Sequence, residues 1–260
     1  LFESGDSFVL RHFSGESGLS REIRRFPKME YSAAGSIDGI LLLKSVEGGV
    51  TAVSSLTGSR IWTTTQPDLS IADGVAAGAA RILLKRDSGF AVVRLSDGNV
   101  EGELPAADYV RVFGGDDDAG IFALAGNGDF VLVDPENGDA RWRFRTGGTV
   151  TGAVGAGTSV LFGSTDNFVY KLNLRRGTVD WKSRIGDRVL DPPIVSSGYF
   201  FVPNRLRMTV EIHSLGTGKP VNSLPVDDGM RILAVAPGAD GSVAVVTTQT
   251  VYSFAKSCSE

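Results

Sequence analysis

The side chains most often used for metal binding or for proton transfer near neutral pH are scarce in this chain, which has two histidines and one cysteine. His12 and His213 fall in the first and the sixth of the repeats described below. In a ring of seven repeats the seventh would separate them, so we expect no shared metal and interpret both as partly exposed strand residues. Because Cys258 is the only cysteine, neither an intrachain disulfide nor a cysteine-based metal cluster can form.

Carboxylates offer a second kind of chemistry, which is calcium binding. The stretch GGDDDAG, residues 114–120, places three of them side by side. It lacks the alternating spacing and the Glu of a defined calcium loop, so a solvated hairpin turn is the better interpretation. No nucleophile and base that could support a hydrolase or a lyase stand out either. The sequence therefore predicts no catalytic residues, no metal site and no bound cofactor.

A glycine within a polar turn recurs along the chain at intervals of 39 to 41 residues. The six glycines are Gly18, Gly58, Gly98, Gly138, Gly177 and Gly218. Three of them precede a tryptophan by four residues, and these are Trp62, Trp142 and Trp181; Glu22, Gly102 and Asn222 stand at that offset in the other three. Self-similarity at this period indicates a protein built from units of about 40 residues.

Each unit reads as four short strands. In residues 147–186, TVTGAVG is rich in small residues, SVLFGS is apolar, and FVYKLNL and TVDWKSRI alternate. We expect turns at 155–157, 165–167 and 175–177, and we find no helical periodicity in the chain. Four-stranded antiparallel units of this length, repeated around a ring, are typical of a β-propeller. The sequence therefore predicts an all-β fold, a β-propeller of four-stranded antiparallel blades.

The glycine and the tryptophan have structural roles in this prediction. The glycine permits a left-handed corner between the third and the outermost strand, and the tryptophan on the outermost strand packs its large apolar face between neighbouring blades. We assign this role to a set of six residues. They are Gly58, Trp62, Gly138, Trp142, Gly177 and Trp181.

The number of blades follows from the two ends of the chain. LFESGDSFVLRHF aligns with a second strand, and RILAVAPGADGSVAVVTTQTVYSFAKS supplies only three strands. Counting both partial units gives about seven blades in one domain, residues 1–260, whose first and last blades are incomplete. An eighth blade would need residues outside this sequence. The chain starts at Leu1 without a signal-like segment, so we expect any targeting sequence to have been removed or to lie outside it.

Two repeats match a known pattern closely. In one, the matching residues are Gly163, Asp166, Tyr170, Gly177 and Trp181; in another, they are Asp129, Asp134, Gly138 and Trp142. With this pattern the chain resembles the PQQ-like propeller superfamily, which includes quinoprotein alcohol dehydrogenases and the BamB-type lipoproteins of outer-membrane assembly. The resemblance implies the propeller fold and leaves the activity open.

Two kinds of function follow from the resemblance. A BamB-like protein is a non-catalytic scaffold that presents the loops of its propeller faces to envelope proteins. A quinoprotein dehydrogenase holds PQQ and calcium at the mouth of the central channel, with the quinone between a tryptophan and a ring formed by two adjacent cysteines. This chain has one cysteine, and the repeat accounts for its three tryptophans. We therefore favour the scaffold, and keep a PQQ-dependent dehydrogenase or a small-ligand binder at the channel mouth as alternatives.

Charge and hydropathy limit the partners. The formal net charge is −4, which gives no reason to expect nucleic acid as a partner. No stretch of 18 apolar residues is present, so we expect no insertion into a membrane. We predict that the partners are other proteins and that the domain is monomeric. The resemblance implies a periplasmic or extracellular location.

The turns between second and third strands form the surface most suited to partners. They carry Asp6, Glu47, Asp87, Asn127 and Asp166, which suggests a mostly acidic ring, although tight hairpin turns also require such residues. The sixth turn differs, because VPNRLRMTV has Arg205, Leu206, Arg207 and Met208 in place of turn formers. Met and Arg are enriched at protein interfaces. We predict that these four residues contact a partner, and the alternative is that Leu206 and Met208 fold back onto the neighbouring blade.

Overall fold

The structure is a computed structural model that describes residues 2–13, 20–37, 39–66, 68–76, 81–105, 108–116, 120–227, 230–238 and 242–254. Gly18, Cys258 and the centre of the GGDDDAG stretch lie outside these residues. Every regular element within the described residues is a β-strand, as predicted. None of the described residues forms a helix long and apolar enough to cross a membrane.

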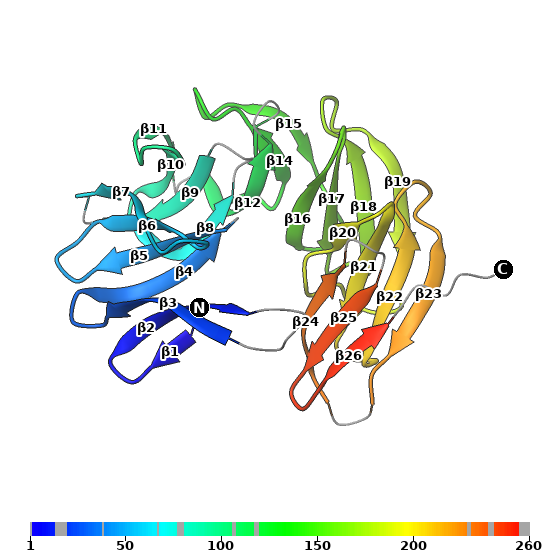
Figure 1. The fold of residues 1–260 in the computed structure, drawn as a ribbon. Helices are drawn as coiled ribbons and strands as arrows, with labels where there is room; N and C mark the ends of the chain where they lie inside the picture. Colours follow the sequence, from blue (N-terminus) through cyan, green and yellow to red (C-terminus); the bar gives the residue numbers. More distant parts are fainter. Residues whose placement is uncertain are drawn as a thin grey trace. The chain divides into compact units, whose positions relative to one another are not determined.

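The strands form seven antiparallel sheets, in each of which neighbours in sequence are neighbours in space (Figure 1). The first sheet is β1 (Phe2–Ser4), β2 (Ser7–Phe13) and β3 (Ser20–Pro27). The second is β4 (Tyr31–Ile37), β5 (Ile40–Ser45), β6 (Val50–Ser54) and β7 (Arg60–Thr64). The third is β8 (Ser70–Ala76), β9 (Arg81–Arg86), β10 (Gly89–Arg94) and β11 (Val100–Pro105). The fourth is β12 (Tyr109–Asp116), β13 (Gly120–Ala125), β14 (Phe130–Val133) and β15 (Ala140–Phe144).

The remaining sheets follow the same order. The fifth is β16 (Val150–Ala156), β17 (Ser159–Ser164), β18 (Phe168–Asn173) and β19 (Val179–Arg184). The sixth is β20 (Ile194–Ser196), β21 (Tyr199–Asn204), β22 (Thr209–Ser214) and β23 (Pro220–Pro225). The seventh is β24 (Ile232–Pro237), β25 (Val243–Thr247) and β26 (Val251–Phe254). The first and last sheets thus have three strands each. In the fifth sheet β16 continues to Ala156, so the predicted turn at 155–157 begins two residues too early.

The outermost strand of the repeat has a fixed irregularity. In the fifth sheet Lys171 pairs with Trp181 and Leu172 with Val179, so the register shifts by one residue at the tryptophan. The same shift follows the pair Ala52 and Trp62 in the second sheet. In the first sheet it follows the pair Leu10 and Arg24. Arg24 is therefore the structural counterpart of the tryptophans, and Glu22 does not have this position, because Arg24 follows its strand partner Leu10 by 14 residues whereas Trp62 follows its partner Ala52 by 10.

The chain divides into two compact units. One comprises Leu1–Asn127 and Val131–Arg141, and the other comprises Gly128–Phe130 and Trp142–Glu260. In each unit the core lies between successive sheets. In the first, for example, Leu42 and Trp62 pack with Ile82 and Leu84, and all four are nearly fully buried.

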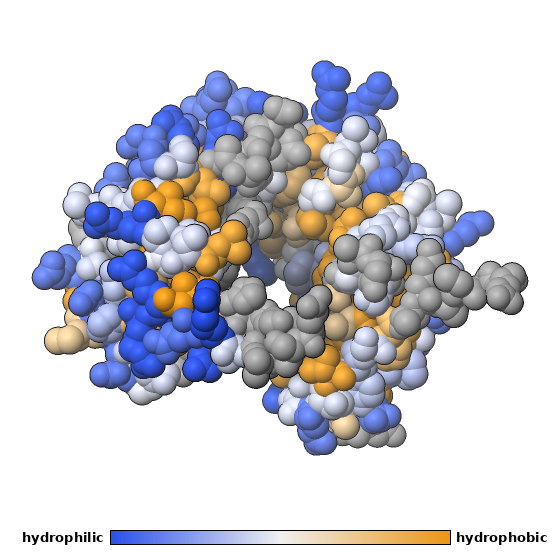
Figure 2. All heavy atoms as spheres, in the orientation of Figure 1, coloured by the Kyte–Doolittle hydropathy of each residue, from blue (hydrophilic) through white to orange (hydrophobic). Residues whose placement is uncertain are grey.

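Apolar alternation on both faces of the inner strands produces these cores. In the second unit, Leu161 and Val169 of the fifth sheet pack with Phe200 and Val202 of the sixth. The opposite face of the sixth sheet belongs to another cluster, which includes Val210. Figure 2 shows hydrophilic residues over much of the visible surface, with apolar residues in smaller groups among them.

Candidate functional site

The tryptophans connect each sheet to the following turn. In the second unit, the Trp142 indole N–H donates a hydrogen bond to the Leu174 carbonyl oxygen at 2.8 Å. Its ring lies against Gly177, where an added β-carbon would be only 2.7 Å from ring atoms of Trp142. Gly177 has φ +65°, as a left-handed corner requires. Both the left-handed backbone and the nearby indole ring thus favour glycine at position 177. The sequence indicated only the left-handed backbone.

The same arrangement recurs at the other two tryptophans. Trp62 donates to the Leu95 carbonyl at 2.7 Å and lies against Gly98. Trp181 donates to the Leu215 carbonyl at 3.2 Å, and its ring lies against Gly218. Gly98, Gly177 and Gly218 each accommodate the tryptophan of the preceding repeat, which lies 36, 35 or 37 residues earlier in the chain. Of the six structural residues named from the sequence, only Trp142 and Gly177 contact each other in this way, because Trp62 and Trp181 lie against Gly98 and Gly218.

In two repeats that lack the tryptophan, other residues connect the sheet to the following turn. Arg24 donates from its guanidinium to the Gly58 carbonyl at 2.7 Å, and its side chain lies against that glycine. The third sheet has Gly102 at the position of the tryptophan. A β-carbon there would lie 2.7 Å from the Pro135 carbonyl oxygen, so a larger residue does not fit. Tyr109 instead donates to the carbonyl oxygen of Gly138 at 2.8 Å.

The sixth turn is held to the preceding loop by two arginines. The Arg205 guanidinium forms a two-point ion pair with Asp191, at 2.6 and 2.8 Å. This pairing raises the pKa of Arg205. The Arg207 guanidinium donates to the Gly186 carbonyl oxygen at 2.9 Å. The loop formed by residues 186–191 is therefore attached to the turn near both of its ends.

A side chain and a residue with positive φ define the backbone of this turn. Asn204 accepts the Arg207 amide hydrogen at 3.0 Å through its side-chain oxygen. Met208 has φ +51°, an uncommon value for a residue with a β-carbon, and it packs against the apolar cluster of the sixth and seventh sheets. Leu206 is 66% exposed. Of the two apolar residues predicted to contact a partner, Leu206 is thus on the surface and Met208 is partly buried against this cluster.

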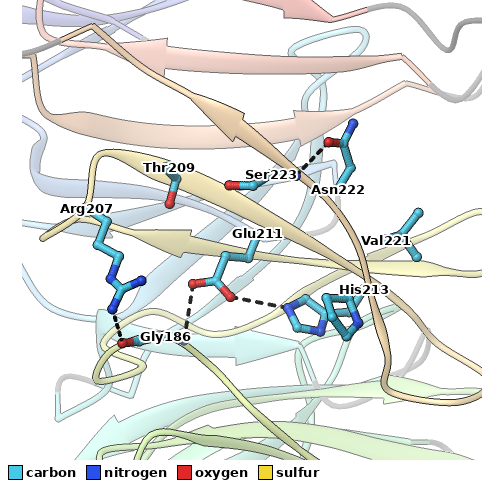
Figure 3. Close-up of a pocket in the computed structure, with 9 residues that line it drawn as sticks. Gly186, Arg207, Thr209, Glu211, His213, Val221, Asn222 and Ser223 are labelled. Carbon is cyan, nitrogen blue, oxygen red and sulfur yellow. Dashed lines mark hydrogen bonds and ion pairs between the residues drawn. The ribbon is translucent and has the colours of Figure 1, made fainter.

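A pocket of about 410 Å³ opens next to this turn (Figure 3). Its lining residues are Gly186, Arg207, Thr209, Glu211, His213, Pro220, Val221, Asn222 and Ser223. Figure 3 shows Arg207 directed at Gly186, with Glu211 between Gly186 and His213. We call the turn 205–208 together with this pocket the sixth-repeat surface.

Glu211 is the centre of the polar contacts in the pocket. One carboxylate oxygen accepts from the Asn204 side-chain amide at 3.1 Å and from the Gly186 amide at 3.3 Å. The other faces His213 Nε2 at 3.4 Å. The hydrogen bond to His213, supported by those to Asn204 and Gly186, lowers the pKa of Glu211, and burial opposes it. Glu211 therefore ties the preceding loop to β22 as an ionised carboxylate.

His213 is buried, with 2% of its surface exposed, so the prediction of a partly exposed histidine is wrong. Its ring stacks on Phe200, which stacks on Trp181. The apolar stacking removes the ring from solvent, and hydrogen bonds to polar neighbours compensate the loss of water. The backbone of His12 lies in β2, and its side chain is outside the described part of the chain.

Ser183, His213 and Glu211 have the composition of a catalytic triad without its geometry. His213 Nδ1 lies 3.3 Å from the Ser183 hydroxyl and 3.2 Å from the Gly218 carbonyl oxygen. A neutral imidazole carries one N–H, so His213 can donate from Nε2 to Glu211 or from Nδ1 to the Gly218 carbonyl oxygen, and only in the first case can Nδ1 accept from Ser183. Ser183 is buried. We therefore interpret the three residues as a group that positions β22.

One position that lines the pocket differs in character from its counterpart in the fifth repeat, where aromatic rings pack together. Phe162 and Tyr170 of the fifth sheet are paired across strands and stack at 5.3 Å. Phe144, two residues after Trp142, packs on Tyr170 at 5.5 Å. The corresponding residues one repeat later are Val202 and Glu211 of the sixth sheet and Ser183 of the fifth. Of these three, Glu211 lines the pocket, and only an alignment of the repeats could have indicated this difference from the sequence.

The acidic turns have a structural role in at least one repeat. Asp166 accepts the Gly147 amide at 2.9 Å and the Tyr170 hydroxyl at 2.7 Å with the same carboxylate oxygen. Burial, with the Asp166 carboxylate adding to it, raises the pKa of Tyr170. Among the described residues, no group of three His, Cys, Asp or Glu side chains is placed to hold a metal ion.

The sequence model of a protein family matches residues 46–253, and this family is described as Outer membrane protein assembly factor BamB. The chain belongs to this family.

The BamB family resemblance extends to an individual sequence and to solved structures. The Outer membrane protein assembly factor BamB of Nitrosomonas eutropha is 31% identical over 101 residues, which are 38% of this chain and 24% of that protein. The crystal structure of BamB from Moraxella catarrhalis has a TM-score of 0.60 at 13% identity, covering 97% of this chain and 84% of that one. The computationally designed Ika8 protein has a TM-score of 0.64 at 12% identity, covering 91% of this chain and 74% of that one.

These comparisons confirm the fold class and the family. At 12 and 13% identity the structural matches show the fold alone. With the seven antiparallel sheets they support an all-β propeller fold built from PQQ-like repeats, as the sequence predicted. The matched segment of the Nitrosomonas eutropha BamB is about a quarter of that protein, so the activity and the partners of this chain have to be argued from its own residues.

Proposed function

We propose that the protein is a non-catalytic scaffold in outer-membrane protein assembly, located in the periplasm, and that its sixth-repeat surface contacts a protein partner. Membership of the BamB family supports the assembly role. The observation that carries the contact site is the exposure of Leu206, at 66%, on a turn that two arginines hold in place. An exposed leucine on a fixed turn can enter an interface without a large loss of conformational entropy.

The surroundings of Leu206 fit a protein interface. Leu190, next to the Asp191 partner of Arg205, is 49% exposed, and Val221 on the rim of the pocket is 55% exposed. Apolar anchors surrounded by arginines and polar groups are typical of the energetic centre of protein interfaces. The pocket beside the turn provides room for a side chain of the partner, and the Thr209 and Ser223 hydroxyls in its wall can form hydrogen bonds with it.

A quinoprotein dehydrogenase has less support from the same residues. The indoles of Trp62, Trp142 and Trp181 each donate to a main-chain carbonyl and pack on a glycine, so each has a role in joining successive sheets. Using one of them to stack on a quinone would require that packing to open.

The test is capture of envelope proteins with the purified chain as bait. We expect components of outer-membrane assembly, identified by mass spectrometry, to be retained by the wild type and lost with Leu206→Ser combined with Arg207→Ser. Leu56→Ser combined with Arg60→Ser is the matched control, because it removes an exposed leucine and an exposed arginine from another turn and strand. Equal capture by all three proteins, at equal melting temperature, would remove the sixth-repeat surface from the proposal.

A further inference from the structure

The charge of this acidic chain is unevenly distributed. Residues 168–190, which contain β18, β19 and the loop that follows, carry six Lys or Arg and two Asp. The rest of the chain carries 20 Lys or Arg and 28 Asp or Glu. A positive segment on a negatively charged protein creates a local potential that attracts anionic groups, and salt weakens this attraction.

The cations lie along one edge of the fifth sheet. The sheet order is β16, β17, β18 and β19, so β19 is its outermost strand (Figure 1). Arg175 and Arg176 occupy the turn that leads into β19, and Lys182 and Arg184 alternate along it. All four are exposed. We call these four residues the basic edge.

The basic edge has a defined backbone and uncommitted charges. The Asn173 side-chain oxygen accepts the amide hydrogens of Arg175 and Arg176, at 3.2 and 3.1 Å, which fixes the turn. Lys182 lies 5.0 Å from the centre of the Phe168 ring. None of the four forms an ion pair with a carboxylate of the described residues, whereas Arg94, Arg141 and Arg205 on other sheets do.

We propose that the basic edge binds an extended acidic segment of a polypeptide. The cations follow a strand and its turn, and Lys182 and Arg184 stand two residues apart on β19, as alternate side chains do along an extended chain. A membrane surface is a poorer match, because Val179 is the one large apolar residue of β19 that is exposed, and surface-bound proteins insert several. Lysines on an edge strand also oppose pairing with other sheets, which is the structural alternative. This proposal does not depend on the sixth-repeat surface.

The test uses a fluorescent peptide of alternating Glu and Ser and the purified wild-type chain. We expect saturable binding that weakens as salt is raised. Arg175→Ser, Arg176→Ser and Arg184→Ser together should weaken it by about tenfold, since each exposed charge contributes a small part of the affinity. Arg21→Ser, Arg60→Ser and Arg231→Ser form the matched control, because they remove the same charge from exposed sites on other sheets.

Three outcomes would overturn the proposal. The peptide could fail to bind at low salt, it could bind the two triple variants equally, or the chain could bind phosphatidylglycerol vesicles and not the peptide. Equal melting temperatures of the two variants exclude unfolding as the cause of a difference. Leu206→Ser combined with Arg207→Ser should leave peptide binding unchanged, so this proposal and the proposed scaffold function can fail separately.

Discussion

The indole ring of Trp142 lies where a β-carbon of Gly177 would have to be, with Cγ and Cδ2 of the indole 2.7 Å from that position. The two residues belong to successive repeats, and Trp62 with Gly98 and Trp181 with Gly218 repeat the relationship. In the repeat that contains Gly177 and Trp181, the two residues therefore take part in two different contacts. Gly177 lies against Trp142 of the repeat before it, and Trp181 lies against Gly218 of the repeat after it.

Alanine at Gly177 should therefore destabilise the protein far more than alanine at Gly157. Both glycines have left-handed backbone conformations, with φ +65° and +62°, so both variants have a strained backbone that costs about 1 kcal/mol. Only Gly177→Ala also creates a clash, because nothing lies within 4 Å of a β-carbon at Gly157. We expect urea denaturation to show an additional loss of about 1 to 3 kcal/mol for Gly177→Ala. Equal losses for the two variants would contradict the proposed contact.

Trp142 should contribute through its ring and through its N–H group. Trp142 is 9% exposed, so Trp142→Ala should lower the free energy of unfolding by about 3 to 5 kcal/mol. Trp142→Phe retains most of the apolar contact and removes the donor to the Leu174 carbonyl, which should cost about 1 to 3 kcal/mol. Urea denaturation measures both. A melting midpoint unchanged in Trp142→Ala would refute the packing role.

The sequence was sufficient for the architecture because the repeat is encoded locally. Alternating apolar residues, turn glycines with positive φ and the 40-residue period determine strands and turns without information on distant contacts. The sequence did not show why position 177 excludes a β-carbon, because the indole of Trp142 that excludes it lies 35 residues earlier in the chain. His213 was misjudged for a similar reason. Its burial depends on Phe200 and Trp181, which reach it only in the folded state.

The sequence indicated only part of the sixth-repeat surface. The unusual composition of 205–208 marked the turn, and the structure places Leu206 at the surface. The attachment of this turn through Asp191 and Gly186 was not visible, since neither residue belongs to a recognisable motif. The pocket was missed as well, because Glu211 becomes informative only when it is compared with Tyr170 of the preceding repeat.

Glu211 should make stability depend on pH in the acidic range. Folding lowers the pKa of Glu211 from its ordinary value of 4.5, so the native state favours the carboxylate. This stabilisation is complete above pH values near 4.5 and is lost as the pH falls through the lowered pKa of the folded state. We expect wild type to melt at a higher temperature than Glu211→Gln at pH 7 and the difference to shrink as the pH is lowered below 4.5. A difference that is constant with pH would show that the ionised carboxylate is not responsible.

The scaffold proposal also predicts an absence of quinoprotein chemistry. Purified protein mixed with PQQ and calcium should not reduce an artificial electron acceptor when alcohols or sugars are added, because the chain has no pair of adjacent cysteines to form the stacking ring. Dye reduction is followed by absorbance, with a quinoprotein dehydrogenase as positive control. Reproducible reduction that requires PQQ would overturn the assignment as a non-catalytic protein.

The most direct test of the scaffold proposal is photo-crosslinking from position 206 in the envelope of the source cell. A photoreactive phenylalanine analogue would replace Leu206 in one protein and Leu56, which is 80% exposed on a turn of the second sheet, in the control. We predict a discrete crosslinked product from position 206, containing a component of outer-membrane assembly identified by mass spectrometry, and none from position 56. The same products from both positions, or none from position 206 in a correctly folded protein, would contradict the proposal that the sixth-repeat surface presents this protein to its partner.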